Sequence, residues 1–240
     1  MFLKYSENKN ILKHLGIIMD GNRRWAKSKK LKPIEGHKKG IETAKIIIKE
    51  AIKKKILFLT LYAFSSENWK REPSEIEDLM ELLRLFLNTE IQSLSESGVK
   101  LTVLGDLSQF DKDIRENIKK ASLLNKKKYK INLIMAINYG ARQEITNALQ
   151  KICKKLLNDT IKFNQITEKE IECNLYTNGI PDPDLIIRTG GDSRLSNFLL
   201  WQAAYAELMF FKKPWPEFTK RDFSKAILDF NNRERRFGGK

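Results

Sequence analysis

The segment HLGIIMDGNRRWAK spans residues 14–27 and carries the strongest local signal for a fold class. Residues 15–19 form a short apolar run typical of a buried strand, and Asp20-Gly21 ends the strand and begins a helix. A strand that turns directly into a helix is the basic unit of an α/β sheet. Such a turn exposes backbone N–H groups at a helix N-terminus, and these favour an anionic ligand.

The alternation of strands and helices continues along the chain. Further strands are expected at residues 57–64, 99–104, 131–137, 185–187 and 208–211. Helices are expected at residues 36–55, 73–97, 114–124, 143–157, 167–175 and 221–231. This alternation favours a central, mainly parallel sheet flanked by helices. We therefore predict one α/β domain over residues 1–240, with a mobile N-terminal segment at 1–13 and a C-terminal arm at 232–240.

Composition and charge narrow the class of protein. The chain is 41% hydrophobic, and no apolar run reaches the roughly 20 residues that a membrane span needs. Cys153 and Cys173 lack zinc or redox spacing, so a reduced, cytoplasmic protein is expected. The formal net charge of +15 leaves nucleic acid, an anionic membrane surface and phosphorylated small molecules as partners.

Polar clusters follow four of the expected strands, at residues 20–25, 65–71, 138–142 and 188–192. Because ligands bind beyond the carboxyl ends of parallel strands, we expect these clusters to share one site. Asp20 would repel a phosphate unless a cation lies between them, and Mg²⁺ fills this role in many phosphate sites. The alternative is that Asp20 only caps the helix after it.

A second anion site is indicated by the turn that begins at Arg188. Two glycines, Arg194 and Ser196 follow within eight residues, which suits a phosphate group bound without metal. The alternative is an ordinary loop with surface arginines. Glu207 lies in an otherwise apolar stretch at 203–208, so it is either a second metal ligand or the partner of a buried arginine.

The helix expected over 75–97 has an unusually wide apolar face. It belongs either to the ordinary core or to the wall of a cavity for a long apolar ligand. The sequence has no Walker A motif, no dinucleotide fingerprint and no HExxH. A P-loop nucleotide site, a Rossmann cofactor site and an HExxH zinc site are therefore not expected.

Six ordered segments together closely resemble the cis-prenyltransferase family. They are HLGIIMDGNRRWAK (14–27), GHKKG (36–40), LTLYAFSSENWKR (59–71), INYGAR (137–142), DLIIRTGGDSRLSNFLLWQAAYAE (184–207) and NRERRFGG (232–239). The resemblance implies an apolar tunnel and the magnesium-dependent condensation of isopentenyl diphosphate, in cis, onto an allylic diphosphate, usually farnesyl diphosphate. It implies a long product such as undecaprenyl diphosphate, a lipid-carrier precursor for cell-wall synthesis. The family's tunnel floor matches Ile131.

The resemblance also assigns roles to residues. Asp20 and Asn68 match catalytic positions, with Asn68 orienting a group that takes the proton, and Asp20 and Glu207 match Mg²⁺ ligands. The positions that match substrate contacts are Gly21, Asn22, Arg23, Arg24, Trp25, His37, Ser65, Ser66, Glu67, Trp69, Arg71, Arg188, Arg194 and Ser196. Residues 235–238 match an arm that completes the neighbour's site in family homodimers. The resemblance also implies peripheral contact with the inner membrane face at product release. It implies no nucleic-acid partner.

Three departures from the family pattern affect the expected site. Arg23 stands where many members have glycine, Lys32-Pro33 where an arginine usually stands, and Ser193 where many bacterial members have histidine. Two rival functions remain: a basic nucleic-acid-binding protein, from the net charge, and an α/β phosphohydrolase, from Asp20 and the arginines. The phosphohydrolase does not account for the wide apolar helix.

Overall fold

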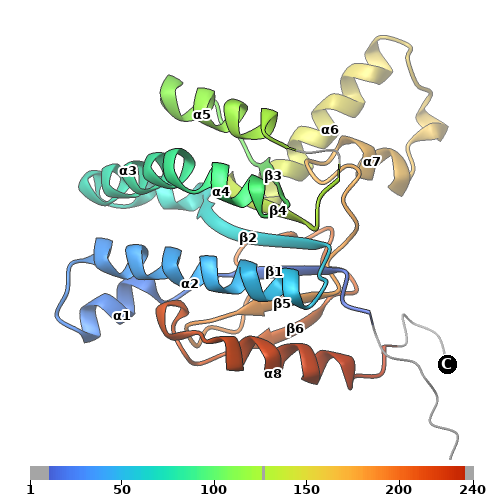
Figure 1. The fold of residues 1–240 in the computed structure, drawn as a ribbon. Helices are drawn as coiled ribbons and strands as arrows, with labels where there is room; N and C mark the ends of the chain where they lie inside the picture. The colour runs from blue at the N-terminus through green and yellow to red at the C-terminus, as the bar shows by residue number, and fades with distance from the viewer. Residues whose placement is uncertain (1–10, 126–127, 236–240) are drawn as a thin grey trace, which may run out of the picture.

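Six parallel strands form one central sheet in the computed structural model, which describes residues 11–125 and 128–235. Their order is β3-β4-β2-β1-β5-β6 (Figure 1). The bounds are β1 (His14–Ile18), β2 (Phe58–Ser65), β3 (Val99–Leu104), β4 (Ile131–Tyr139), β5 (Leu185–Arg188) and β6 (Glu207–Phe210). The predicted α/β class with a parallel sheet is confirmed, and the predicted strand ends differ from the observed ones by two residues or fewer.

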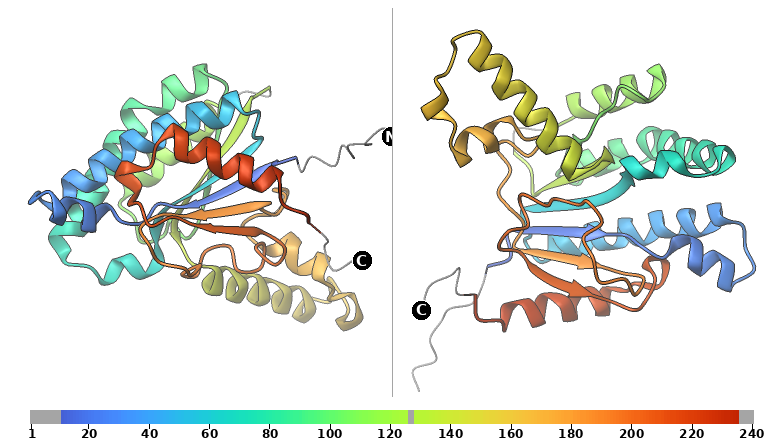
Figure 2. Two further views of the ribbon diagram at one scale, coloured as in Figure 1. Left: turned by 90° about the horizontal axis from the view of Figure 1, so that it is seen from below. Right: turned by 180° about the vertical axis from the view of Figure 1, so that it is seen from behind.

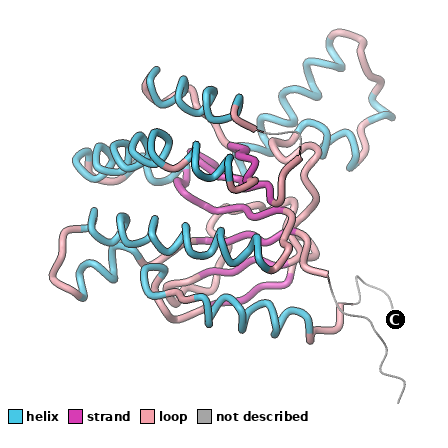
Figure 3. Tube along the Cα trace, viewed as in Figure 1, coloured by secondary structure: helices cyan, strands magenta, loops and turns pink. Residues whose placement is uncertain are grey.

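The helices lie outside the sheet (Figure 3). They are α1 (Asn22–Ser28), α2 (Pro33–Lys53), α3 (Pro73–Thr89), α4 (Ile91–Glu96), α5 (Lys112–Leu123), α6 (Ala141–Leu157), α7 (Glu168–Asn174) and α8 (Lys220–Asn231), with the 3-10 turns η1 (Ser66–Lys70), η2 (Phe163–Gln165) and η3 (Trp215–Glu217). α2, α3, α5 and α8 cover one face (Figures 1 and 2). The loop after β5 and the start of α6 pack on the other face. Apolar clusters on both faces hold the layers together.

β4 shows why the sheet is parallel and buried. All nine of its residues are buried, which is the environment of a strand covered on both faces. Ile131, Leu133, Met135 and Ile137 belong to the core beneath α2 and α3, whereas Ile134 and Ala136 belong to the opposite core. This alternation fixes which side chains of β4 face each layer of helices.

The helix predicted over 73–97 is divided at Glu90 into α3 and α4. The Thr89 hydroxyl donates to the Leu85 carbonyl (2.9 Å), a bond to the preceding turn that bends helices. The Glu90 carboxylate pairs with Lys45 of α2 (2.7 Å). A side-chain bond and a tertiary ion pair thus interrupt a helix that its apolar periodicity alone would continue.

The carboxyl ends of the strands meet at one edge of the sheet, as predicted. Ile18 is paired with Tyr62 of β2 and with Arg188 of β5, and Ser65 is paired with Tyr139 of β4. The residues after these four strands therefore lie close together. The sequences after β1, β2, β4 and β5 are the polar clusters from which a site was predicted.

The chain ends are only partly described. Residues 1–10 and 236–240, which hold much of the predicted N-terminal segment and C-terminal arm, lie outside the described residues. Leu12, within the predicted N-terminal segment 1–13, is buried in the core. No helix within 11–125 or 128–235 is both long enough and apolar enough to cross a membrane.

Candidate active site

The turn after β1 brings Asp20 to the edge of the sheet with an unusual backbone. Gly21 has φ of 103°, a left-handed value that suits glycine, and a Cβ there would lie 2.7 Å from Pro214 Cβ. Its N–H donates to Asp20 Oδ1 (2.6 Å), and Asn22 then begins α1. The turn thus presents a carboxylate directly before a helix N-terminus.

Asp20 lies within a cluster of arginines. Its Oδ2 accepts from Arg188 Nη2 (2.9 Å) and pairs with Arg24 Nη2 (3.0 Å). Burial alone would raise the pKa of Asp20, but the hydrogen bond from Arg188 and the charge of Arg24 outweigh it and lower the pKa. Asp20 is therefore an anion at neutral pH, and this answers the helix-cap alternative: its side chain faces arginines.

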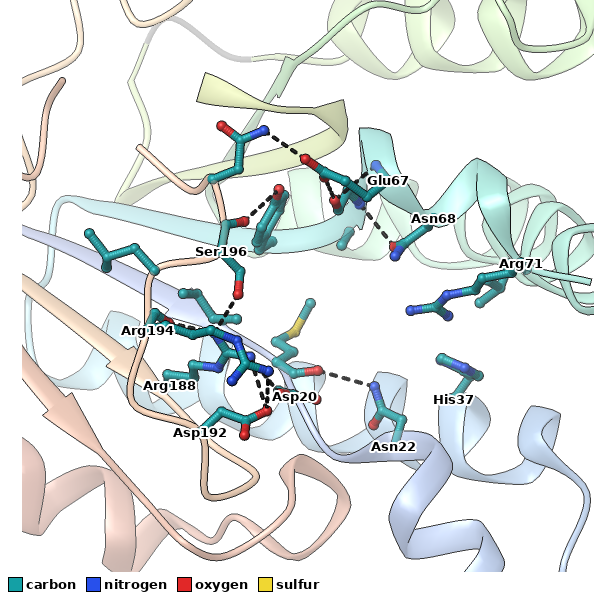
Figure 4. Close-up of a pocket in the computed structure, with 18 of the residues that line it drawn as sticks. Asp20, Asn22, His37, Glu67, Asn68, Arg71, Arg188, Asp192, Arg194 and Ser196 are labelled. Atoms are coloured by element: carbon teal, nitrogen blue, oxygen red, sulfur yellow. Dashed lines mark hydrogen bonds and ion pairs between the residues drawn. The ribbon is translucent and has the colours of Figure 1, made fainter. Parts of the chain in front are cut away.

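Asp192 is a second carboxylate in the same cluster, which the sequence prediction did not include among the site residues. Its Oδ2 lies 3.3 Å from Arg188 Nη2 and 3.5 Å from Arg24 Nη2, the two nitrogens that also reach Asp20. Asp20 and Asp192 therefore lie side by side (Figure 4). The available signal was the place of Asp192 directly after the two glycines, in the same turn as Arg188.

Arg188 and Arg194 have different surroundings although they belong to the same turn. Arg188 is buried, and its Nη1 donates to Ser196 Oγ (2.7 Å) and to the Arg194 carbonyl. The Arg194 side chain is 64% exposed and its Nη2 pairs with Asp192 (2.9 Å). Arg188 thus organises the turn from inside, while Arg194 faces the solvent at its mouth.

η1 forms the opposite wall of the site. The Asn68 side-chain carbonyl accepts from the Ser65 N–H (3.0 Å), and Ser65 Oγ accepts from the Glu67 N–H (3.1 Å). This bond fixes the Asn68 amide, and its NH₂ group can donate to a ligand. Ser65 and Ser66 donate their hydroxyls to Glu67 Oε2, and Asn197 Nδ2 donates to Glu67 Oε1 (2.8 Å).

Glu75 at the start of α3 gathers the remaining basic groups. Its carboxylate pairs with Arg71 (2.9 Å) and Arg23 (3.5 Å), and His37 Nε2 lies 3.7 Å away. Burial and then the Arg71 charge lower the pKa of His37 to about 4, so this imidazole is neutral at pH 7. Glu75 was absent from the predicted site, because its contacts to α1 and α2 exist only in the folded chain.

A cleft of about 840 Å³ opens between these walls. Eleven of the predicted residues line it: Asp20, Asn22, Arg24, His37, Ser65, Glu67, Asn68, Arg71, Arg188, Arg194 and Ser196. Arg142 and Asp192, which belong to the predicted polar clusters but had no assigned role, also line it, as does Asn197, which was not predicted. A neighbouring cleft of about 640 Å³ is lined by Gly21 and Arg23 together with Lys27, Lys30 and Pro33. Two lysines thus supply cations beside Pro33.

An apolar cavity lies next to the polar cleft. It measures about 130 Å³ and is enclosed by α2, α3 and the sheet, with Ala44, Ile48, Leu83, Phe86 and Leu133 among its walls. Five residues line both spaces: Met19, Asn22, His37, Ala63 and Leu79. The wide apolar face of the predicted 75–97 helix is therefore the wall of a cavity as well as core.

Within one chain, the structure does not bring together Asp20 and Glu207, the two predicted Mg²⁺ ligands. Glu207 is paired with Leu185 at the amino end of β5, whereas Asp20 follows the carboxyl end of β1. Within one chain the two carboxylates lie at opposite ends of the sheet, because parallel register separates them along the strands. Glu207 pairs with Arg233, whose side chain is 37% exposed, so this partner is not the buried arginine of the second alternative.

Two predicted substrate residues point elsewhere. Trp25 Nε1 donates to Glu217 Oε1 of η3 (3.0 Å), and Trp69 Nε1 donates to Asn138 Oδ1 (2.9 Å). Trp69 also packs on Phe64 and Phe110. Neither indole is among the side chains that line the two polar clefts. Both tryptophans support the elements that carry the site. Ser66 does not line the cleft, but its hydroxyl donates to Glu67, which does.

Known proteins resemble this chain over nearly its whole length. A family model described as undecaprenyl diphosphate synthase matches residues 18–238. An isoprenyl transferase of Rickettsia typhi is 47% identical over 227 residues, which cover 95% of this chain and 98% of that protein. An isoprenyl transferase of Clostridium tetani is 46% identical over 230 residues, which cover 96% of this chain and 90% of that protein.

Two solved structures share the fold. Lavandulyl diphosphate synthase from Lavandula x intermedia, in complex with dimethylallyl diphosphate, has a TM-score of 0.92 and 35% identity, covering 95% of this chain and 98% of that one. A probable undecaprenyl diphosphate synthase from Campylobacter jejuni has a TM-score of 0.79 and 36% identity, covering 95% and 99%.

Proposed function

Because this chain belongs to the undecaprenyl diphosphate synthase family of cis-prenyltransferases, we propose that it condenses isopentenyl diphosphate units in cis onto farnesyl diphosphate. The product is a long-chain polyprenyl diphosphate such as undecaprenyl diphosphate, a precursor of the cell-wall lipid carrier. One observation supports this most: the cation-lined cleft and the apolar cavity share five lining residues. A site with a polar half for diphosphates and an apolar half for a hydrocarbon tail fits prenyl diphosphates.

The residues present fit a bound Mg²⁺. Mg²⁺ is held by one or two carboxylates together with substrate oxygens rather than by an all-protein cage. Asp20 and Asp192 offer two adjacent carboxylates, and the described residues contain no group of three or more metal-ligating side chains. Asp20 would hold the ion against the allylic diphosphate, with Asp192 beside it. Bound there, the ion would neutralise charge on the departing diphosphate.

The residues of the chain would divide the chemistry between the two walls. The exposed N–H groups of the Gly21 turn, Arg23 and Arg24 bind the allylic diphosphate, while Arg194 and Ser196 bind isopentenyl diphosphate. The allylic C–O bond breaks, a C–C bond forms to the isopentenyl unit, and that unit then loses a proton. The Asn68 NH₂ group, as a hydrogen-bond donor, orients the diphosphate oxygen or water that accepts the proton, while the Ser65 N–H fixes the amide through its carbonyl oxygen.

A homodimer belongs to the proposal. β6 is the edge strand at one side of the sheet, and the Tyr205 and Phe210 side chains are 67% and 40% exposed. Exposed edge strands with apolar side chains favour pairing with another chain. Glu207 and Arg235 lie at this side of the molecule, so we propose that they approach a partner's site together with residues 236–238, which lie outside the described residues. A cytoplasmic enzyme at the inner membrane face, which receives the product, completes the proposal.

Incubating the purified protein with Mg²⁺, farnesyl diphosphate and labelled isopentenyl diphosphate tests this function. We expect labelled polyprenyl diphosphates that disappear when either substrate is omitted. Release of inorganic phosphate without chain elongation would favour the phosphohydrolase. Tight, salt-sensitive binding of a DNA or RNA duplex in a gel-shift experiment, without elongation activity, would favour the nucleic-acid-binding protein.

A further inference from the structure

The loop that carries Ser196 has an unusual backbone. Ser196, Asn197 and Leu199 have φ of 48°, 64° and 45°, so three of four successive residues adopt left-handed conformations without being glycine. Such values are uncommon for residues with a Cβ, and asparagine tolerates them better than most. A conformation of this kind persists only where contacts with the rest of the protein impose it.

Asn197 makes those contacts with two other elements. Its backbone carbonyl accepts from the Ala141 N–H (2.9 Å) and its Oδ1 accepts from the Arg142 N–H (2.8 Å). These are the first two N–H groups of α6, which no turn of the helix can satisfy. The residue before α6, Gly140, offers no side chain of its own, so Asn197 caps the helix from a distant segment.

The remaining side-chain group of Asn197 points to the opposite wall. Its Nδ2 donates to Glu67 Oε1 (2.8 Å), and Glu67 Oε2 accepts from the hydroxyls of Ser65 and Ser66. A Cβ on Gly140 would lie 2.7 Å from Asn197 Nδ2 and 2.5 Å from Ser66 Oγ. Glycine at position 140 thus admits the bridge between Asn197 and the η1 wall.

The bridge joins the two halves of the cleft. On one side, Ser196 precedes Asn197 directly and accepts from Arg188 Nη1 (2.7 Å). On the other side, Ser65 links Glu67 to Asn68, whose side chain accepts from the Ser65 N–H (3.0 Å). Burial alone would raise the pKa of Glu67, but hydrogen bonds from Ser65 and Asn197 lower it, which keeps the carboxylate charged.

We propose that Asn197 is a positioning residue that sets the spacing between the isopentenyl-binding turn and Asn68. This inference rests on the proposed function, because it concerns the relative placement of the two substrates in that reaction. Asn197 acts through Ser196 and Glu67 and transfers no proton itself. Reacting groups misplaced by about 1 Å can lose about 100-fold in rate, so a change in this spacing would affect turnover strongly.

Asn197→Asp separates positioning from folding. The aspartate keeps an acceptor for the Arg142 N–H at the start of α6, where a negative charge is favourable and offsets the repulsion from Glu67, so we expect the melting temperature to change little. It loses the donor to Glu67 and places two carboxylates together. We expect kcat to fall about 10- to 100-fold and the isopentenyl diphosphate KM to rise. Asn178→Asp, at an exposed position away from the cleft, is the matched control and should change neither.

Exchanging the partners gives the decisive measurement. In Glu67→Gln with Asn197→Asp, the glutamine NH₂ can donate to the new carboxylate, so the bridge re-forms with its donor and acceptor reversed. We expect the double variant to recover at least about 10-fold of the kcat lost in Asn197→Asp. An inactive wild-type protein would overturn the proposed function. Two results with an active wild type would overturn the positioning role alone. One is an Asn197→Asp variant with unchanged kcat. The other is a double variant whose loss in kcat equals the product of the losses in the two single variants.

Discussion

Arg188 and Arg194 are the same type of residue but have different roles, because one is buried and the other is exposed. The terminal nitrogens of Arg188 contact the carboxylates of Asp20 and Asp192, the Ser196 hydroxyl and the Arg194 carbonyl. The Arg194 side chain pairs with one carboxylate, that of Asp192, and is 64% exposed. A buried guanidinium held at four points orders its surroundings, and an exposed one is available to a ligand.

The two arginines should therefore respond differently to lysine. Arg194→Lys keeps the charge and loses the planar fork, so we expect the isopentenyl diphosphate KM to rise about 10-fold with a smaller change for farnesyl diphosphate. Arg188→Lys loses several buried hydrogen bonds, so we expect kcat and the melting temperature to fall together. Steady-state kinetics with each substrate varied in turn, together with thermal melts, measure both effects. Equal KM changes for the two substrates in Arg194→Lys would contradict separate diphosphate sites.

Asp20→Asn tests the metal-associated carboxylate. The amide keeps the shape and loses the charge, so we expect turnover to fall about 1,000-fold or more while the circular dichroism spectrum is unchanged. Wild-type activity should vanish in EDTA and return on addition of Mg²⁺. Asp111→Asn, which breaks an ion pair with Arg84 away from the cleft, is the control and should keep its activity. Wild-type rates that persist in EDTA would refute the metal assignment.

Two buried histidines predict a loss of stability in mild acid. Burial lowers the pKa of His14 to about 4 and, together with Arg71, that of His37 to about 4. Between pH 6.5 and 4 the unfolded chain binds protons that the folded imidazoles refuse, so the free energy of unfolding falls as the pH falls. For His14 this lowering of the pKa corresponds to a loss of about 3 kcal/mol in the free energy of unfolding, which is complete below about pH 4.

Urea denaturation at pH 7.5, 6.5, 5.5 and 5.0 measures this loss. Within this window most carboxylates are still ionised, so the slope reports mainly the histidines. His14 contacts Thr60 Oγ1 through Nε2 (2.7 Å) and the Pro181 carbonyl through Nδ1 (2.6 Å). His14→Gln should lower stability at pH 7.5 and flatten the decline toward pH 5. A decline as steep in the variant as in the wild type would show that His14 does not cause it.

At the scale of elements, the sequence best predicted the features that depend on local pattern. The strands result from apolar runs, and the grouping of Asp20, Asn68 and Arg188 results from their places at strand ends. Parallel strands bring their carboxyl ends together whatever their order in the sheet. The cleft could therefore be located from the chain without knowing that β1 lies between β2 and β5.

Features that depend on contacts between elements were beyond the sequence. The separation of Glu207 from Asp20 within one chain depends on the register of Glu207 with Leu185, which cannot be read from the sequence. The break at Glu90 depends on Lys45 of α2, and the role of Glu75 depends on Arg23 and His37 from two other helices. Trp25 and Trp69 match substrate positions of the family, but their indole N–H groups donate to Glu217 and Asn138.

α2 and α3 are the walls that a long product would have to move. The apolar cavity of about 130 Å³ is below the roughly 300 Å³ of small ligand pockets, so it is smaller than the proposed polyprenyl tail requires. The strands on its other side are held together by the hydrogen bonds of the sheet. α2 and α3 lie outside the sheet and are tied to each other by the ion pair of Lys45 with Glu90. In the proposed reaction, elongation would therefore displace α2 or α3 outward.

Ile131 tests where that displaced cavity ends. It is fully buried and precedes Leu133, which lines the cavity on the same face of β4. Ile131→Ala removes side-chain bulk at a cost of about 2–5 kcal/mol in stability. If Ile131 is the floor, chromatography of the products should show longer chains while the first condensation keeps its rate. Ile134→Ala on the opposite face of β4 should cost similar stability and leave the product length unchanged; equal lengths from both variants would place the floor elsewhere.

At the scale of the whole molecule, the two ends of the sheet carry separate functions. The carboxyl end holds the clefts, while the amino end holds Glu207, Asp184 and the described start of the C-terminal arm, where Arg235 pairs with Asp184 (2.9 Å). A single chain cannot bring these groups to its own Asp20. In the proposed homodimer a second copy would supply them, and the exposed β6 edge is the proposed docking surface.

Deleting residues 236–240 separates assembly from catalysis. The deletion leaves the Arg233–Glu207 and Arg235–Asp184 pairs intact, so we expect light scattering to report an unchanged dimer. If the arm completes a partner's site, kcat should fall about 10-fold or more. A catalytically intact truncated protein would exclude the arm from the site, and an active monomer of the full chain would exclude the dimer.

The continuity of the polar cleft with the apolar cavity has a consequence for processivity. In the proposed reaction the lengthened tail would enter the apolar cavity after each condensation while its diphosphate returns to the Asp20 turn, and the two spaces share five lining residues. Each added unit brings five more carbons out of water, at about 0.8 kcal/mol per carbon, so the intermediate is held more tightly as it grows. In the proposed reaction we therefore expect short intermediates to escape rarely, and we expect the finished chain to depart slowly unless a bilayer or detergent receives it.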